Sequence, residues 1–175
     1  MLRRHLAGHG PAAAPEVRTC YLLRHAVALS RSSWQGEDEL RPLSRRGDRQ
    51  ALALAREFAP EPVARVLASP ARRCVGTVAG IAQEAGRLVE IAPFLAEGSD
   101  GPAALKDLLE ITGSTEHPGV VVACTHGDVL VGVMDALAAS AAFEGSPSPI
   151  PKGGAVRLDV AAGAVVGVSL LPAPD

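Results

Sequence analysis

Apolar positions recur along the chain at two spacings, and their succession predicts alternating strands and helices. Short apolar runs, typical of buried strands, occupy residues 17–23, 63–68, 88–91 and 119–124. Stretches with helical spacing occupy residues 44–59, 71–85, 102–111 and 128–142. Because helices separate the first four strands, we expect these strands to pair in parallel with right-handed crossovers.

The ends of the chain and its turns complete this prediction. Residues 154–160 and 164–171 predict a closing hairpin, with Ala161-Ala162-Gly163 as its turn. We expect residues 1–16 to form a mobile tail, residues 17–175 to form one domain, and the polar segments 26–43 and 145–151 to form loops. Ser44 and Asp128 are expected to cap helices at their N-termini and Gly86 at a C-terminus. The sequence therefore predicts an α/β fold with a mostly parallel central sheet.

Composition narrows the possible partners. The 175 residues are 47% hydrophobic and 21% charged, with a net charge of −2 and only 3% aromatic residues. This profile gives no global attraction to nucleic acid or to anionic lipid, and no segment reaches the roughly 20 apolar residues of a membrane span. Cys20, Cys74 and Cys124 are scattered and lack metal-ligand spacing, so we expect structural thiols and a cytoplasmic location.

Cationic and imidazole side chains follow three of the predicted strands. Arg24-His25 ends the first strand, Ser69-Pro70-Ala71-Arg72-Arg73 links the second to a helix, and Thr125-His126-Gly127 follows the fourth. The carboxyl ends of parallel strands meet at one edge of a sheet, where open α/β folds bind ligands. Two histidines and two arginines gathered there predict a site for a phosphoryl group.

Charged loop residues are candidates for the rim of this site. Glu97 lies in the loop after the third strand, and Arg31, Arg41 and Lys152 lie in other polar loops. We expect Arg31, Arg41 and Lys152 to contact substrate, and Asp38 to orient Arg41 through an ion pair.

The order strand-Arg-His-Ala, Ser-Pro-x-x-Arg opening a helix, and strand-x-His-Gly resembles the histidine phosphatase superfamily, with its phosphoglycerate mutase-like fold. The Arg-His-Ala form and the absence of a large cap insertion resemble the SixA-like phosphohistidine phosphatase branch. Residues 38–47, Arg73-Cys74 and Lys152-Gly153 are also similar to phosphatase domains fused to Nudix hydrolases in actinobacteria. The resemblance implies a three-layer α/β/α architecture, with the sheet in the middle.

The same resemblance implies roles for the site residues. His25 would be the nucleophile, and Arg24, Arg73 and His126 would hold the phosphoryl oxygens. Glu97 is the candidate proton donor, and neither a cofactor nor a metal is expected. Gly76 stands where the family often has glutamine. The chain itself lacks a Nudix signature.

Three functions stay open at this point. A SixA-like enzyme would remove phosphoryl groups from phosphohistidine on a protein. A second possibility is a phosphatase for a small metabolite, such as a nucleotide or sugar phosphate, contacted by Arg31, Trp34 and Arg41. The third is a phosphate-binding module without catalysis, although binding alone does not require a nucleophilic imidazole.

Overall fold

The computed structural model of the chain describes residues 16–140 and 149–175. The expected tail falls outside the described residues except for Glu16, as do residues 145–148 of the expected loop and the expected helix end at 141–142.

One mixed sheet forms the centre of the structure. Its strands are β1 (Arg18–Arg24), β2 (Val63–Ala68), β3 (Val89–Ile91), β4 (Val120–Thr125), β5 (Ala155–Ala161) and β6 (Ala164–Leu171), in the order β3-β2-β4-β1-β5-β6. The first four are parallel as predicted, whereas β5 and β6 run antiparallel to their neighbours. The hairpin prediction is confirmed by the antiparallel pairing of β5 with β6. Its turn is one residue shorter than predicted, because Ala161 belongs to β5 and only Ala162 and Gly163, both with positive φ, form the turn.

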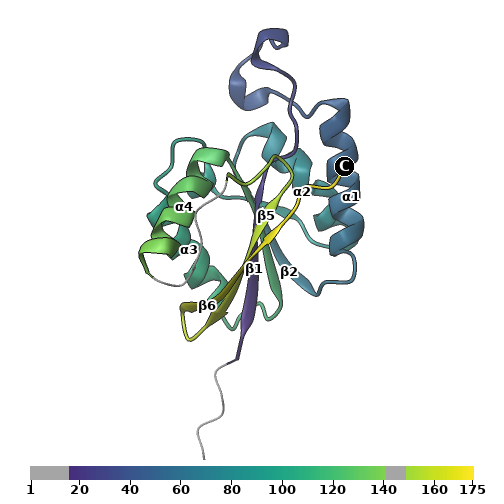
Figure 1. Cartoon of the computed structure of the whole chain (residues 1–175). Coiled ribbons are helices and arrows are strands. Elements are labelled where there is room, and N and C mark those ends of the chain that lie inside the picture. The colour runs from purple at the N-terminus through teal and green to yellow at the C-terminus, as the bar shows by residue number, and fades with distance from the viewer. Residues whose placement is uncertain (1–15, 141–148) are drawn as a thin grey trace, which may run out of the picture.

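Two helices cover each face of the sheet (Figure 1). The helices α1 (Arg45–Phe58) and α2 (Arg72–Glu84) lie on one side, and α3 (Gly101–Gly113) and α4 (Gly127–Ala139) lie on the other. Side chains alternate along β1, so that Leu22 packs with α3 and α4 while Tyr21 and Leu23 pack with α1 and α2. β4 is buried along its whole length, as expected of a central parallel strand. The fold is the expected three-layer α/β/α architecture.

Local sequence signals account for two of the helix ends. Ser44 Oγ accepts a hydrogen bond from Gly47 N at 3.2 Å at the start of α1, as predicted. Gly86 has φ +63° after α2, which fits its predicted place at the helix end. The Asp128 prediction was wrong: α4 begins after His126, and Asp128 Oδ2 instead accepts from Gly98 N at 2.6 Å. Asp128 therefore ties the loop after β3 to the first turn of α4.

The segment between β1 and α1 is more ordered than the predicted polar loop. It contains the short 3-10 helices η1 (Arg31–Ser33) and η2 (Asp38–Leu40), and a further one, η3 (Pro93–Leu95), follows β3. An antiparallel bridge between Ala28 and Leu43 closes the base of the segment. Periodicity could not reveal these turns, because each spans only three residues. In residues 16–140 and 149–175, no helix combines the length and apolarity that crossing a bilayer requires.

Candidate active site

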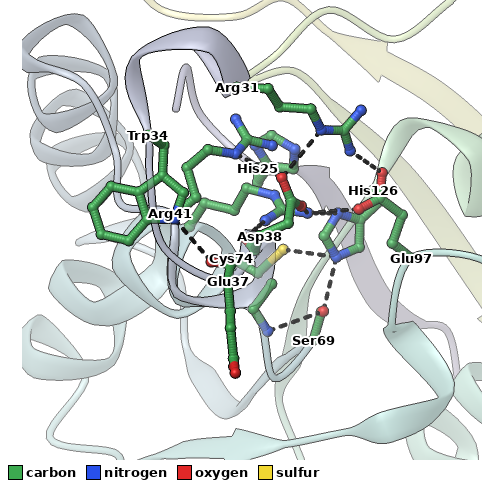
Figure 2. Close-up of polar contacts among 12 residues, drawn as sticks. His25, Arg31, Trp34, Glu37, Asp38, Arg41, Ser69, Cys74, Glu97 and His126 are labelled. Atoms are coloured by element: carbon green, nitrogen blue, oxygen red, sulfur yellow. Dashed lines mark hydrogen bonds and ion pairs between the residues drawn. The ribbon is translucent and has the colours of Figure 1, made fainter. Parts of the chain in front are cut away.

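The carboxyl ends of β1, β2 and β4 bring the predicted side chains together. His25 follows β1, Arg73 lies in the first turn of α2 just after β2, and His126 follows β4. The rings of His25 and His126 have their centroids 5.3 Å apart at an interplanar angle of 65°. Figure 2 shows both rings and the charged side chains from the loops around them.

The backbone fixes the protonation of His25. Its Nδ1 lies 2.8 Å from the carbonyl oxygen of Ala26, which can only accept, so Nδ1 carries the proton and Nε2 keeps its lone pair. Burial lowers the pKa of His25 to about 3, and the charges of His126, Arg73 and Lys152 act in the same direction, while the Ala26 hydrogen bond opposes them. The ring is therefore neutral at neutral pH and has the form that a nucleophile requires.

His126 is held between a hydroxyl and a guanidinium group. Arg73 NH2 can only donate, and it lies 3.4 Å from His126 Nδ1. Nε2 lies 2.8 Å from Ser69 Oγ and 3.5 Å from Cys74 Sγ, and all of these groups are buried. The expected structural thiol of Cys74 thus also touches the site. Ser69 and Cys74 come from the two sides of the β2–α2 junction and set the orientation of the ring.

Arg73 is buried and bound by carboxylates. Its NH2 donates to Glu97 Oε2 at 2.7 Å and lies 3.1 Å from Asp38 Oδ2, and NH1 donates to the Asp38 carbonyl at 2.7 Å. Arg31 bridges the same two acids, with NH2 3.0 Å from Glu97 Oε1 and Nε 3.1 Å from Asp38 Oδ1. The expected ion pair of Arg41 is present too, at 2.9 Å. Hydrogen bonds from Arg31 and Arg41 hold the pKa of Asp38 well below its usual range.

Arg24 anchors the opposite loop against α4. Its NH1 donates to the Ile150 carbonyl at 2.8 Å, and its own carbonyl accepts from Gly153 N at 3.1 Å. The guanidinium lies directly on Gly127, where a Cβ would come within 2.8 Å of Arg24 Cζ. This contact explains why glycine follows His126. In the described part of the chain, Arg24 Nε and Arg73 Nε are buried without a hydrogen-bond partner. Such donors are stabilised when an anion enters the site.

A cavity of about 790 Å³ opens above these groups. Every residue predicted for the site lines it: Arg24, His25, Arg31, Arg41, Arg73, Glu97, His126 and Lys152. The first turn of α4 also faces this cavity, and its N-terminal N–H groups favour an anion. Among the described residues, no three His, Cys, Asp or Glu side chains are arranged to bind a metal ion.

Sequence reasoning missed the residues that support these groups. Ser69 was noted only as part of a motif, and Asp38 only as a partner of Arg41, whereas Asp38 contacts three arginines. Gln50, on α1 and buried, was not singled out. Its Oε1 accepts from Val27 N, and its Nε2 donates to the Lys152 and Pro174 carbonyls. The sequence offers one signal for Gln50: it is a polar residue on the face of α1 that is otherwise apolar and buried.

Comparison with known proteins shows the family of this chain. Residues 20–111 match the model of the histidine phosphatase superfamily (branch 1). A curated protein of Mycolicibacterium smegmatis, an 8-oxo-(d)GTP phosphatase, is 34% identical over 163 residues, which are 91% of this chain and 50% of the relative. The chain thus spans half the length of this relative.

Solved structures share the fold at low sequence identity. The protein histidine phosphatase SixA in complex with tungstate superimposes with a TM-score of 0.65 at 18% identity, covering 87% of this chain and 93% of SixA. Phosphoglycerate mutase from Bacillus anthracis gives a TM-score of 0.67 at 12% identity, with coverage of 92% and 94%. The fold is phosphoglycerate mutase-like, and the chain belongs to the histidine phosphatase superfamily.

Proposed function

We propose that this chain is a phosphatase that works through a phosphohistidine formed on His25. The observation that carries the proposal is the neutral His25 ring, with Nδ1 bound to the Ala26 carbonyl and Nε2 unprotonated in the cavity. Nε2 attacks the phosphorus atom, and the bond from phosphorus to the leaving group breaks, with the leaving group keeping the electron pair. Water then attacks the phosphohistidine, releasing inorganic phosphate and restoring His25.

Positive charge around the phosphoryl group supplies the rest of the chemistry. A loose transition state spreads charge over three equatorial oxygens, so catalysis depends on positioning and electrostatic stabilisation. Arg24 and Arg73 donate to these oxygens, and His126 donates through Nδ1 once the substrate replaces its contact with Arg73 and Nε2 accepts from Ser69 instead. Glu97 is our candidate for protonating the leaving group. The poised His25 nucleophile favours catalysis over a module that only binds phosphate.

Two substrate classes fit this proposal. A phosphohistidine-bearing protein is the substrate that SixA-like enzymes would use, and its labile P–N bond needs little help from an acid. A nucleotide or another small phosphorylated metabolite is the second candidate. It is supported by a cavity large enough for a nucleotide and by the likeness to the M. smegmatis 8-oxo-(d)GTP phosphatase. The three cysteines are free, scattered and buried, and on this ground we also propose a cytoplasmic location.

The nucleophile can be tested with His25→Ala and with His117→Ala as a matched control, because His117 is exposed and outside the cavity. We expect His25→Ala to lower turnover of phosphorylated substrates by at least about 10³-fold, while His117→Ala leaves it unchanged. Brief reaction with a labelled phosphoryl donor should give an acid-labile, base-stable adduct on His25 in the wild type. Turnover near the wild-type rate in folded His25→Ala protein would refute covalent catalysis at this residue.

A further inference from the structure

The cavity contains more cationic groups than one phosphoryl group requires. Arg24, Arg73 and His126 surround the reacting position beside His25, and Arg31, Arg41 and Lys152 also line the cavity. A single phosphoryl group offers three terminal oxygens, which the inner three residues can serve. The outer cations therefore need an explanation of their own, either as partners of protein carboxylates or as ligands for another part of the substrate.

Protein carboxylates accept hydrogen bonds from two guanidinium nitrogens of Arg31 but from only one of Arg41. Arg31 uses its Nε and NH2 on Asp38 and Glu97, and its side chain is 67% exposed, so its NH1 is not held in place by packing. Arg41 is buried, and it gives Nε to Asp38 and NH1 to the Leu29 carbonyl, which holds the guanidinium rigidly. Among residues 16–140 and 149–175, nothing accepts a hydrogen bond from Arg41 NH2. This nitrogen is thus positioned and available to an anion.

Lys152 is positioned by its backbone, and its side chain is left for a ligand. Gln50 Nε2 donates to the Lys152 carbonyl at 3.2 Å, and Gly153, at φ +87°, packs on the Gln50 amide. Arg24 binds the same loop on both sides of Lys152, through the Ile150 carbonyl and Gly153 N. In the described part of the chain, Lys152 Nζ has neither a hydrogen-bond nor an ion-pair partner. Burial lowers the pKa of Lys152, and so do the charges of Arg24, Arg41, Arg31 and Arg73.

We propose that Lys152 and Arg41 form a subsite for a second phosphoryl group, joined to the one that His25 attacks. The inference rests on the proposed phosphatase function and specifies its substrate class: compounds with a terminal phosphoanhydride, such as nucleoside diphosphates or triphosphates. A phosphate leaving group then departs from the subsite with the electron pair of the broken P–O bond. The two cations stabilise the charge that it gains, as donors placed at a developing negative charge do.

The remaining walls of the cavity fit the rest of such a substrate. Leu130, Val131 and Met134 of α4 line the cavity together with Leu29 and Ile150, and they offer an apolar surface for a base. Two acids of α4, Asp128 and Asp135, also line the cavity, and both are exposed. Glu97, the other acid that lines the cavity, is bound by Arg31 and Arg73. In the described part of the chain, no carboxylate of the cavity wall therefore engages Lys152 or Arg41 NH2.

The subsite can be tested by binding, without turnover. Calorimetry with methylphosphonate, which has one phosphoryl-like group, and with methylenebisphosphonate, which has two, gives a ratio of affinities for each variant. We expect the wild type to prefer the bisphosphonate by at least about tenfold, and Lys152→Met to reduce that preference to about threefold or less. Lys106→Met is the matched control, because Lys106 is the only other lysine and is 77% exposed on α3. It should keep the wild-type ratio.

The outcomes separate the subsite from the proposed function. Equal affinities for the two phosphonates in the wild type, or an unchanged ratio in Lys152→Met, would overturn the subsite while the phosphatase proposal stands. Failure of methylphosphonate to bind at all would instead count against the inner phosphoryl site. A parallel comparison of kcat/KM should show that Lys152→Met impairs hydrolysis of a nucleoside diphosphate more than that of the matching monophosphate. An equal loss with phosphohistidine would contradict a subsite specific for the second group.

Discussion

Two carboxylates in this pocket each contact more than one arginine. Asp38 contacts Arg31, Arg41 and Arg73, and Glu97 contacts Arg31 and Arg73. Both acids are 40–47% exposed, whereas Arg73 is almost completely buried. A buried guanidinium without such partners would be strongly destabilising. The acids thus hold the arginines in place until a substrate anion competes for them.

Glu97 has two possible uses, and leaving groups distinguish them. If Glu97 protonates the leaving group, Glu97→Gln should reduce hydrolysis of alkyl phosphates by about 10²-fold and that of aryl phosphates by less than about threefold, because aryl oxides leave without a proton. Steady-state kcat/KM over such a series is the measurement. Glu39→Gln, an exposed acid in the same loop as Asp38, is the control. An equal loss with every leaving group would assign Glu97 to the orientation of Arg73.

The sequence predicted which residues reach the pocket better than it predicted their contacts. Arg24, His25, Arg73 and His126 were found because each follows a recognisable strand, and parallel strands align their carboxyl ends. The salt bridge from Asp38 to Arg73 joins two elements through the fold of the 26–43 segment, which has no periodicity to read. Ser69 was in view, but its contact with His126 depends on the register of β2 against β4.

At the scale of elements, α3 and α4 pack unusually closely at one point. Gly101, the first residue of α3, lies against Gly132 of α4, and a Cβ on Gly101 would come within 2.5 Å of the Gly132 carbonyl carbon. Because α4 carries the N-terminus that faces the cavity, this contact also helps to place the active-site end of that helix. The helical spacing of apolar residues predicted both helices, but it carries no sign that two glycines meet between them.

Substitution of Gly101 should therefore loosen the packing between α3 and α4. We expect Gly101→Ala to lower the free energy of unfolding by about 1–3 kcal/mol, as overpacking of a well-packed interface does. Gly113→Ala, at the other end of α3, is the matched control, since an added Cβ there meets nothing within 4 Å. It should be neutral or stabilising by up to about 1 kcal/mol. Urea unfolding followed by circular dichroism measures both, and equal effects would show that the close approach is not strained.

At the scale of the whole molecule, the neutral His25 links activity to stability. In the folded protein its pKa is about 3, compared with the ordinary 6.5 of an exposed histidine. Between these values the unfolded chain binds a proton that the native state does not. Stability therefore rises with pH through this window and is lost as the pH falls from about 6.5 towards 3.

His25→Asn should remove this contribution. We expect the free energy of unfolding of the wild type to fall with acidification by up to about 1.4 kcal/mol per pH unit more than that of His25→Asn. Denaturant unfolding at several pH values between 4 and 7 provides the comparison, and His117→Asn serves as the exposed control. Parallel curves for wild type and His25→Asn would mean that the folded protein protonates His25 as readily as the unfolded chain does.

The position of β1 in the sheet also determines when, during synthesis, the active site can form. β1 pairs on one side with β4 and on the other with β5, so that Cys20 lies between Val121 and Leu158. During synthesis both neighbours emerge more than about 100 residues after β1, and contacts this distant in sequence form slowly. A nascent chain that ends before β4 would therefore leave both hydrogen-bonding edges of β1 unpaired and would lack His126. The nucleophile is made before β4 and β5, but it can become active only after both of these strands have been made.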